Sequence, residues 1–256
     1  MKKIFLSFLL ATSLAQLSFA QKMEPKDTEV WEPKPAKVTP GKTAADAPSD
    51  AIVLFSSNHL NEWVSSADTT KPARWTVSND IFTVNKGTGN IQTKRLFTDY
   101  QLHLEWRIPA VIHGSDQARG NSGVFLALNG KDGNGYEIQV LDNYENQTYV
   151  NGQAGSVYKQ AIPLVNACRE PGAWQTYDII WTAPKFDVKG ELVSPARVTL
   201  IHNGVLVQNN TAIKGITQYI GLPHYKVAHG ASAIMLQDHG DPSEPISFRN
   251  IWIRPL

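Results

Sequence analysis

The sequence has little cysteine and little net charge, and each shortage excludes a class of protein. Its 256 residues contain one cysteine, Cys168, which excludes an internal disulfide framework and a multi-cysteine metal site. With 24 basic and 23 acidic residues the net charge is +1, so there is no broad basic surface for nucleic acid and no polybasic anchor for a membrane. We therefore expect neither a nucleic-acid partner nor membrane insertion.

Several catalytic motifs are missing as well. Gly-x-Ser-x-Gly, His-Glu-x-x-His and Gly-x-Gly-x-x-Gly do not occur, so no nucleophile elbow, zincin site or dinucleotide fold is indicated. Retaining glycosidases place two carboxylates across the sugar bond, and glucanases of the laminarinase type carry them on one strand as Glu-x-Asp-x-x-Glu. The matching segment here reads Glu137-Ile138-Gln139. This disfavours two-carboxylate hydrolysis, unless Glu105 or Asp142 completes the pair.

Residues 1–20 have the features of a signal peptide. Lys2 and Lys3 precede an apolar run at residues 4–10, and residues 18–20 read Ser-Phe-Ala, a small-x-small cleavage site. The apolar stretch is too short and too interrupted to be a good bilayer span. We expect cleavage after Ala20 and a secreted or periplasmic mature protein.

The rest of the chain divides into a linker and one β domain. Residues 21–50 are rich in proline and charge and cannot bury enough surface to fold alone, so they form a tether or a strap along the domain. From residue 51 to 256, short runs alternate between apolar and polar residues and are punctuated by turn residues. No amphipathic helix of ten residues is apparent, and this pattern predicts an all-β sandwich or barrel. We expect strands at residues 51–55, 74–77, 81–84, 99–107, 122–128, 135–141, 177–181, 197–202, 205–207, 233–237 and 246–253.

Two of these strands carry candidate site residues. Glu137 and Gln139 share one face of their strand, opposite an apolar face, so they point away from the core and line a cleft if that sheet is concave. Gln237 and His239 likewise share a face, and Asp238 is placed to orient the imidazole. The alternative is a solvated outer face, or a structural histidine.

The other candidates lie in turns or between apolar residues. Arg119 and Asn121 offer hydrogen-bond donors in a glycine-containing turn. The alternative is that this segment is only a tight turn with no role in binding. Tyr158 and Lys159 end a short strand, and Lys159 acts as an acid or base only if it is buried. Arg249 suits either a carboxylate partner in the fold or a sugar hydroxyl.

Eight motifs, in order, closely resemble a family first known as a domain of unknown function. It is now described as 3-keto-glucoside 1,2-lyase/3-keto-2-hydroxyglucal hydratase, or 3-keto-disaccharide hydrolase. The motifs cover about residues 52 to 256 and begin at Leu102, Ala118, Tyr136, Val157, Trp174, Ala196, Leu236 and Phe248. The resemblance implies a concanavalin A-like jelly roll, with two antiparallel sheets of which one is concave, in a secreted bacterial protein.

The implied chemistry needs one base, one acid and donors to an oxyanion rather than paired carboxylates. A ketone at C3 acidifies the C2 proton, its removal gives an enediolate, and the C1 substituent leaves. We expect Glu137 or His239 to be the base, with the other assisting the leaving group, and Tyr158 and Lys159 as further acid candidates. Gln139, Gln237 and Arg119 would hold hydroxyls or the C3 oxygen. In the alternative, Asp142, Glu137 and His239 bind a divalent cation.

The substrate would be an oxidised glycoside or disaccharide, supplied by an upstream sugar 3-dehydrogenase. No cofactor is indicated apart from that divalent metal ion. Three other functions stay open: a carbohydrate-binding module of the same fold, a conventional glycosidase, and an attachment or scaffold role that uses the linker.

Overall fold

The computed structural model describes residues 23–129 and 134–256, so the expected signal peptide lies outside the described residues. The chain divides into two compact units, Met1–Lys37 and Val38–Leu256. The described part of the first unit holds one short 3-10 helix, η1 (Pro25–Thr28). Within residues 23–129 and 134–256, no helix has the length and apolar character needed to cross a membrane.

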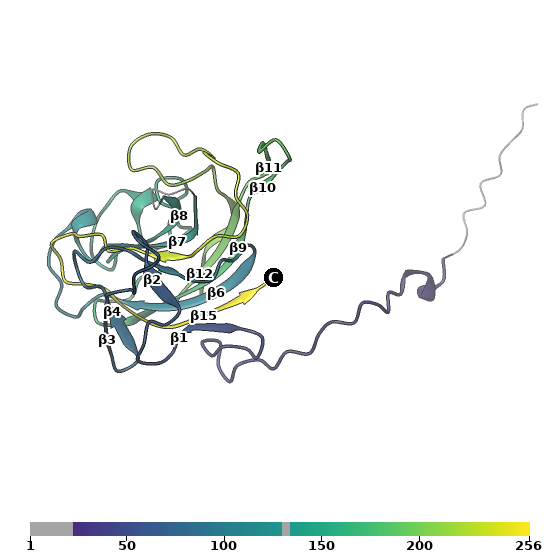
Figure 1. The fold of residues 1–256 in the computed structure, drawn as a ribbon, viewed down its shortest axis with the longest axis horizontal. Coiled ribbons are helices and arrows are strands. Elements are labelled where there is room, and N and C mark those ends of the chain that lie inside the picture. Colours follow the sequence, from purple (N-terminus) through teal and green to yellow (C-terminus); the bar gives the residue numbers. More distant parts are fainter. Residues whose placement is uncertain (1–22, 130–133) are drawn as a thin grey trace, which may run out of the picture. The chain divides into compact units, whose positions relative to one another are not determined.

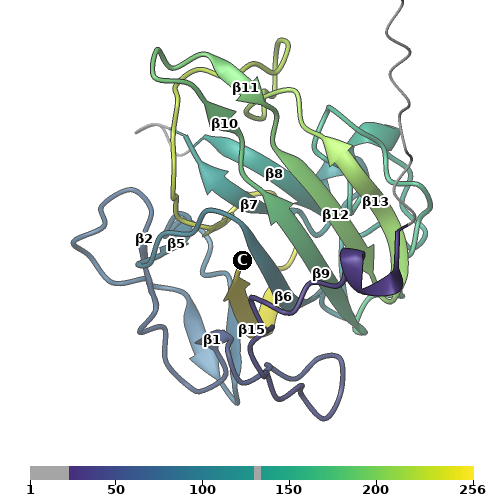
Figure 2. The same ribbon diagram turned by 90° about the vertical axis from the view of Figure 1, so that its right-hand side faces the viewer.

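The second unit is a sandwich of two antiparallel sheets (Figure 1). The larger sheet has the order β13-β12-β9-β6-β15-β4-β3, with β1 also paired to β15 (Figure 2). Its strands are β1 (Ile52–Phe55), β3 (Thr76–Ser78), β4 (Ile81–Thr83), β6 (Tyr100–Arg107), β9 (Trp174–Thr182), β12 (Arg197–His202), β13 (Val205–Ala212) and β15 (Ser247–Pro255).

The smaller sheet has the order β2-β5-β14-β7-β8. Its strands are β2 (Trp63–Ser65), β5 (Ile91–Thr93), β7 (Ser122–Leu128), β8 (Gly135–Val140) and β14 (Met235–Leu236). The remaining elements are a ribbon of β10 (Lys185–Phe186) and β11 (Leu192–Ser194) and the 3-10 helices η2 (Asp116–Ala118) and η3 (Val150–Gly152). The all-β jelly-roll prediction is confirmed.

Local sequence explains the tight hairpins. Asn203 and Gly204 join β12 to β13 with φ angles of 53° and 82°, the two positive values that a type I′ turn requires. Asn79 and Asp80 join β3 to β4 in the same way, with φ angles of 53° and 56°. Asparagine, aspartate and glycine tolerate this backbone region better than other residues, so these turns set the register of both hairpins.

Two tyrosines of the larger sheet hold the smaller sheet in place across the core. The hydroxyl of Tyr100 in β6 donates to the carbonyl of Leu126 in β7 at 2.6 Å, and that of Tyr177 in β9 donates to the carbonyl of Gln139 in β8 at 2.7 Å. Both side chains are fully buried. A buried hydroxyl must find a partner, so each bond fixes the distance between the sheets as well as satisfying a polar group.

A buried charged cluster lies on the other face of the larger sheet. His103 Nδ1 lies 2.7 Å from Asp178 Oδ1, and Arg249 Nε donates to Glu105 Oε2 at 2.6 Å. Burial alone would lower the pKa of His103, but hydrogen bonds and charge from Asp178 and Glu105 outweigh it and raise the pKa to about 9. His103 is therefore a cation at neutral pH, held between two carboxylates.

Part of the predicted linker packs beside this cluster. The carbonyl of Ala45 accepts hydrogen bonds from Asn250 Nδ2 and Trp252 Nε1, both at 2.9 Å. The Trp252 ring stacks on the His103 ring, with centroids 5.3 Å apart. Residues 38–50 thus belong to the second unit and lie along β15 as a strap.

Stability should fall as His103 loses its proton. Because its folded pKa is about 9 and its ordinary value 6.5, its contribution is complete below pH 6.5 and is lost as the pH rises through 9. The loss is on the order of 3 kcal/mol. Thermal unfolding followed from pH 6 to 10 should show this loss in the wild type. His103→Gln should be less stable at pH 6 but change much less over the same range. The exposed His59→Gln is the control, and parallel curves for wild type and His103→Gln would contradict the prediction.

Candidate functional site

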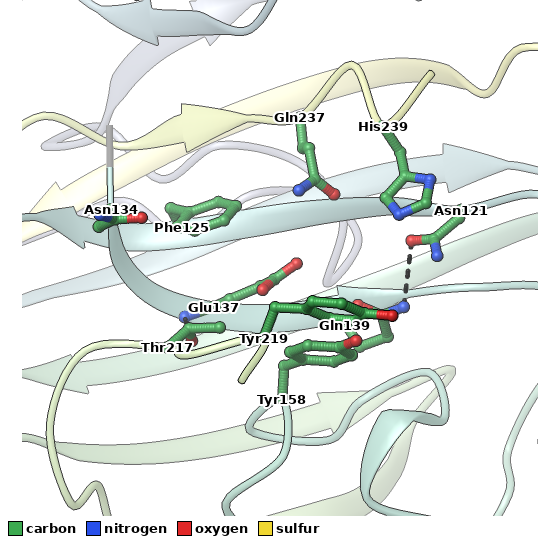
Figure 3. Close-up of a pocket in the computed structure, with 10 residues that line it drawn as sticks. All are labelled: Asn121, Phe125, Asn134, Glu137, Gln139, Tyr158, Thr217, Tyr219, Gln237 and His239. Atoms are coloured by element: carbon green, nitrogen blue, oxygen red, sulfur yellow. Dashed lines mark hydrogen bonds between the residues drawn. The ribbon is translucent and has the colours of Figure 1, made fainter. Parts of the chain in front are cut away.

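A pocket of about 240 Å³ lies on the smaller sheet, on the face turned away from the core (Figure 3). Glu137 and Gln139 from β8 lie in its middle, with Gln237 and His239 on one side and Tyr158 and Tyr219 on the other. Its lining residues are Asn121, Phe125, Asn134, Glu137, Gln139, Tyr158, Thr217, Tyr219, Gln237 and His239. Six of the sequence-predicted residues therefore come together: Asn121, Glu137, Gln139, Tyr158, Gln237 and His239.

Strand β8 is buried on both of its faces. Tyr136, Ile138 and Val140 face the core, as expected. The opposite face is covered too, so Glu137 is only 5% and Gln139 only 1% exposed. At the free edge of β8, the Ser156 carbonyl accepts from the backbone amide of Gln139, and the Thr217 hydroxyl accepts from the backbone amide of Glu137. These bonds lie in the plane of the sheet and hold beside β8 the segments that bring Tyr158 and Tyr219 to the pocket. The site is therefore a pocket that encloses the Glu137 and Gln139 side chains rather than an open polar face.

Glu137 is a buried carboxyl group without a hydrogen-bond partner for its side chain in the described residues. Burial raises its pKa from 4.5 to about 8, because a low-dielectric site penalises the charged form. A carboxyl group in this state is mostly protonated at neutral pH. Once ionised, it is a stronger base than an ordinary glutamate, which is the condition that general-base catalysis near neutral pH requires.

Side-chain amides form the second part of the pocket. Gln139 Nε2 donates to Asn121 Oδ1 at 3.1 Å (Figure 3). It also donates to Gln117 Oε1 at 3.2 Å. Two amide oxygens, Gln139 Oε1 and Gln237 Oε1, are buried without a partner in the described part of the chain. Such orphaned acceptors are costly unless a donor arrives, and sugar hydroxyl groups are donors of this kind.

Tyrosines form the wall opposite Gln237. The Tyr158 hydroxyl lies 2.5 Å from that of Tyr149, and burial raises the pKa of Tyr158 well above its usual value. Lys159, predicted as a site residue, does not line the pocket. Its ammonium group donates to the carbonyl of Tyr219 at 2.6 Å and lies 4.3 Å from the centre of the Tyr219 ring. Lys159 thus anchors the loop that brings Tyr219, itself 72% exposed, to the pocket.

His239 lies at the exposed side of the pocket, and its carboxylate neighbour is not the predicted one. Asp238 accepts a hydrogen bond from the Gly89 amide at 3.0 Å instead of orienting the imidazole. Asp241 takes that place, with Oδ1 3.8 Å from His239 Nδ1. Burial would raise the pKa of Asp241, but His239 and Ser243 outweigh it and lower the pKa. Asp241 rather than Asp238 lies beside His239 because the chain turns at Gly240 and brings residue 241 back towards residue 239.

Arg119 and Asp142 belong to the framework rather than to the pocket lining. Arg119 Nε donates to Asp142 Oδ2 at 2.6 Å, and the Asp142 side chain is 2% exposed. A buried carboxylate is retained when it is paired in this way. Asp142 is therefore not brought to Glu137 and His239. Among residues 23–129 and 134–256, no group of three His, Cys, Asp or Glu side chains is arranged to hold a metal ion. The described residues do not fit the predicted metal site.

Arg249 and Glu105 also lie away from the pocket. They pair with one another in the larger sheet, and the Arg249 guanidinium stacks 4.1 Å from the centre of the Trp174 ring. Arg249 thus pairs with a carboxylate of the fold, one of the two roles that the sequence left open, and it is not among the residues that line this pocket. Since Glu105 and Asp142 are both paired elsewhere, Glu137 is the only carboxylate among the described residues that line the pocket.

Four lining residues were missed from sequence: Phe125, Asn134, Thr217 and Tyr219. Phe125 is the register partner of Glu137, so strand pairing would have found it. Thr217 and Tyr219 lie in a long loop without a motif, and only tertiary packing places them. In total, the side chains that line the pocket provide one buried acid-base group, an imidazole at the entrance, phenol hydroxyls and free amide oxygens.

Comparison with known proteins finds a matching family and similar solved structures. Residues 50–254 match the profile of the 3-keto-alpha-glucoside-1,2-lyase-like domain. A crystal structure from Parabacteroides distasonis, provisionally described as a glycosyl hydrolase, is 53% identical, with a TM-score of 0.84 over 91% of this chain and 97% of that chain. Two others of the same organism and description are 21% and 17% identical, each with a TM-score of 0.57, and cover 80% and 86% of this chain and 99% and 100% of their own. They support the fold alone. No curated protein sequence matches this chain.

Replacing Glu137 should stabilise the protein. Because the folded pKa of about 8 exceeds the ordinary 4.5, wild-type stability is lost as the pH rises from 4.5 through 8, and Glu137→Gln does not pay this ionisation cost. Its melting temperature should equal that of the wild type near pH 4.5 and exceed it by about 5 °C or more at pH 8. Calorimetry at both pH values measures the difference, with the exposed Glu145→Gln as control. A difference that does not grow with pH would exclude a raised pKa for Glu137.

Proposed function

The chain belongs to the 3-keto-alpha-glucoside-1,2-lyase-like domain family, and from this premise we propose that it cleaves 3-keto-glucosides or 3-keto-disaccharides by elimination. The observation that carries the proposal is that Glu137, the one carboxyl group among the described residues lining the pocket, is buried and has a pKa raised to about 8. A conventional glycosidase needs a second carboxylate across the sugar bond, whereas removal of an acidified C2 proton needs one base.

In the proposed reaction Glu137 takes the proton from C2, next to the C3 ketone. The electron pair of the C2–H bond moves into the C2–C3 linkage and gives an enediolate with negative charge on the C3 oxygen. When the ketone re-forms, that pair makes a C1–C2 double bond, and the C1–O bond breaks with its electrons on the leaving oxygen, which takes up a proton. The products are an alcohol and a 3-keto-2-hydroxyglucal.

Each role is assigned by position in the pocket. Glu137 lies on the floor, where burial strengthens its basicity. Gln237 has no hydrogen-bond partner for its amide oxygen in the described part of the chain, so this oxygen would accept from a sugar hydroxyl while the amide nitrogen would donate to the C3 oxygen. His239 lies at the exposed side beside Asp241, where the leaving group would depart, and it assists by protonating the leaving oxygen.

Hydration would complete a net hydrolysis. Water adds its hydroxyl to C1 of the enone and its hydrogen to C2, which gives the free 3-keto sugar. The 3-keto substrate requires a sugar 3-dehydrogenase acting earlier, and we propose such an enzyme as a pathway partner. The leader sequence at residues 1–20 supports a secreted or periplasmic location.

Incubation of residues 21–256 with a 3-keto-glucoside and with its unoxidised parent, in deuterated water, tests the proposal. The expected result is release of the alcohol from the keto sugar alone, with deuterium at C2 of the hydrated product. Sugar binding without release would instead indicate a carbohydrate-binding module, and cleavage of the parent a conventional glycosidase. Loss of turnover with a chelator would indicate that the reaction depends on a divalent metal ion.

Substitution of the two reacting side chains should abolish most of the turnover. Glu137→Gln and His239→Asn should each lower kcat by roughly a hundredfold or more with the fold intact, since each removes one proton-transfer step. The exposed substitutions Glu145→Gln and His59→Asn are the matched controls. Circular dichroism checks folding, and near-wild-type rates for both site variants would refute the assignment.

The pH dependence should report the pKa of Glu137. In the free enzyme this pKa is about 8, and only the ionised form accepts a proton. With a 3-keto substrate whose leaving group departs without a proton from His239, such as a nitrophenolate, kcat/KM should therefore rise with pH and level off above 8. The profile of kcat/KM reports groups of the free enzyme. A profile already level at about pH 6 would mean that Glu137 is not the base.

A further inference from the structure

Gly123 lies beside Gln139 in the sheet that forms the pocket floor. It belongs to β7 and is the register partner of Gln139 in β8. Its carbonyl accepts a hydrogen bond from the Gln237 amide at 3.0 Å. The backbone at this position thus connects β8 with the segment that carries Gln237 and His239.

Because Gly123 has no side chain, the carboxyl group of Glu137 can lie directly against the backbone at this position. A Cβ atom built at position 123 would lie 2.4 Å from Glu137 Oε1 and 3.1 Å from both Cδ and Cγ of that side chain. These contacts are shorter than carbon and oxygen atoms tolerate, so the carboxyl group occupies the space that any other residue would fill. The backbone of Gly123 is not in the left-handed region, and chain conformation therefore does not demand glycine there.

We propose that Gly123 is a positioning residue that holds the Glu137 carboxyl group against the floor of the pocket. In this position the carboxyl group is buried and has no hydrogen-bond partner among the described residues, which is the condition that makes it strongly basic. The inference rests on the proposed function insofar as Glu137 is the base, but the placement of the carboxyl group is independent of any reaction.

Gly123→Ala provides the test. The atom that the new methyl group meets is the end of a flexible side chain, so the carboxyl group should move off the floor towards the open part of the pocket while the strands stay paired. We expect a melting temperature within a few degrees of the wild type at pH 5, and a fall in kcat/KM of roughly tenfold to a hundredfold. Better hydration of the carboxyl group should move the rise of kcat/KM to lower pH.

Two further variants separate positioning from packing. Gly230→Ala is the matched control, because nothing lies within 4 Å of a Cβ atom at that position, and it should behave as the wild type. Glu137→Asp shortens the side chain by one methylene group. Combined with Gly123→Ala it should recover part of the lost activity, although Glu137→Asp alone loses activity.

A measurement without substrate distinguishes failure of this inference from failure of the proposed function. Titration of ¹³C-labelled glutamate carboxyl groups by NMR, assigned with Glu137→Gln, gives the pKa of Glu137 directly. The pKa should be lower in Gly123→Ala than in the wild type, whether or not the protein turns over a 3-keto-glucoside. An unchanged pKa, or an activity loss with a large drop in melting temperature and an unshifted pH profile, would overturn the role of Gly123.

Discussion

The candidate site depends on the burial of β8 on both faces. A strand at the side of a five-stranded sheet would ordinarily present one face to water, and its polar side chains would be ordinary surface groups. Here the inner face packs on the core, the outer face is buried as well, and the Ser156 segment and Thr217 bond the free edge of the strand. This double cover removes Glu137 from water and leaves amide oxygens without partners. Both properties make the pocket chemically distinct from the rest of the surface.

The framework residues make that cover possible. Tyr177 reaches across the core to the carbonyl of Gln139, so the position of β8 is set from the larger sheet. Lys159 holds the loop of Tyr219 from the other side, through one hydrogen bond and one cation–π contact. Arg119 and Asp142, away from the pocket, are paired with one another. Glu137 is different, because the described residues supply no counter-charge for it.

Paired and unpaired carboxylates therefore serve different purposes in this protein. Glu105 would have a raised pKa from burial, yet hydrogen bonds from His103, Asn250 and Arg249 lower it to about 2, which keeps it ionised and structural. Glu137 has burial without these partners, and its pKa rises to about 8. Both glutamates are less than a tenth exposed, and they differ in the hydrogen-bonding and charged neighbours around the carboxyl group.

The fold class, eleven of the fifteen described strands and the shared face of Glu137 and Gln139 could be predicted from the sequence, because strand alternation and turn chemistry are local properties, whereas the short strands β2, β5, β10 and β11 were missed. The sequence also determined the family, through motifs spread over the whole domain. The tertiary structure alone decided which polar residues are paired. Arg249 and Arg119 looked equally available in sequence, but their carboxylate partners lie 144 and 23 residues away. Likewise, Asp241 rather than Asp238 meets His239, and Tyr219 reaches the pocket, since pairing and loop packing depend on contacts that no local pattern records.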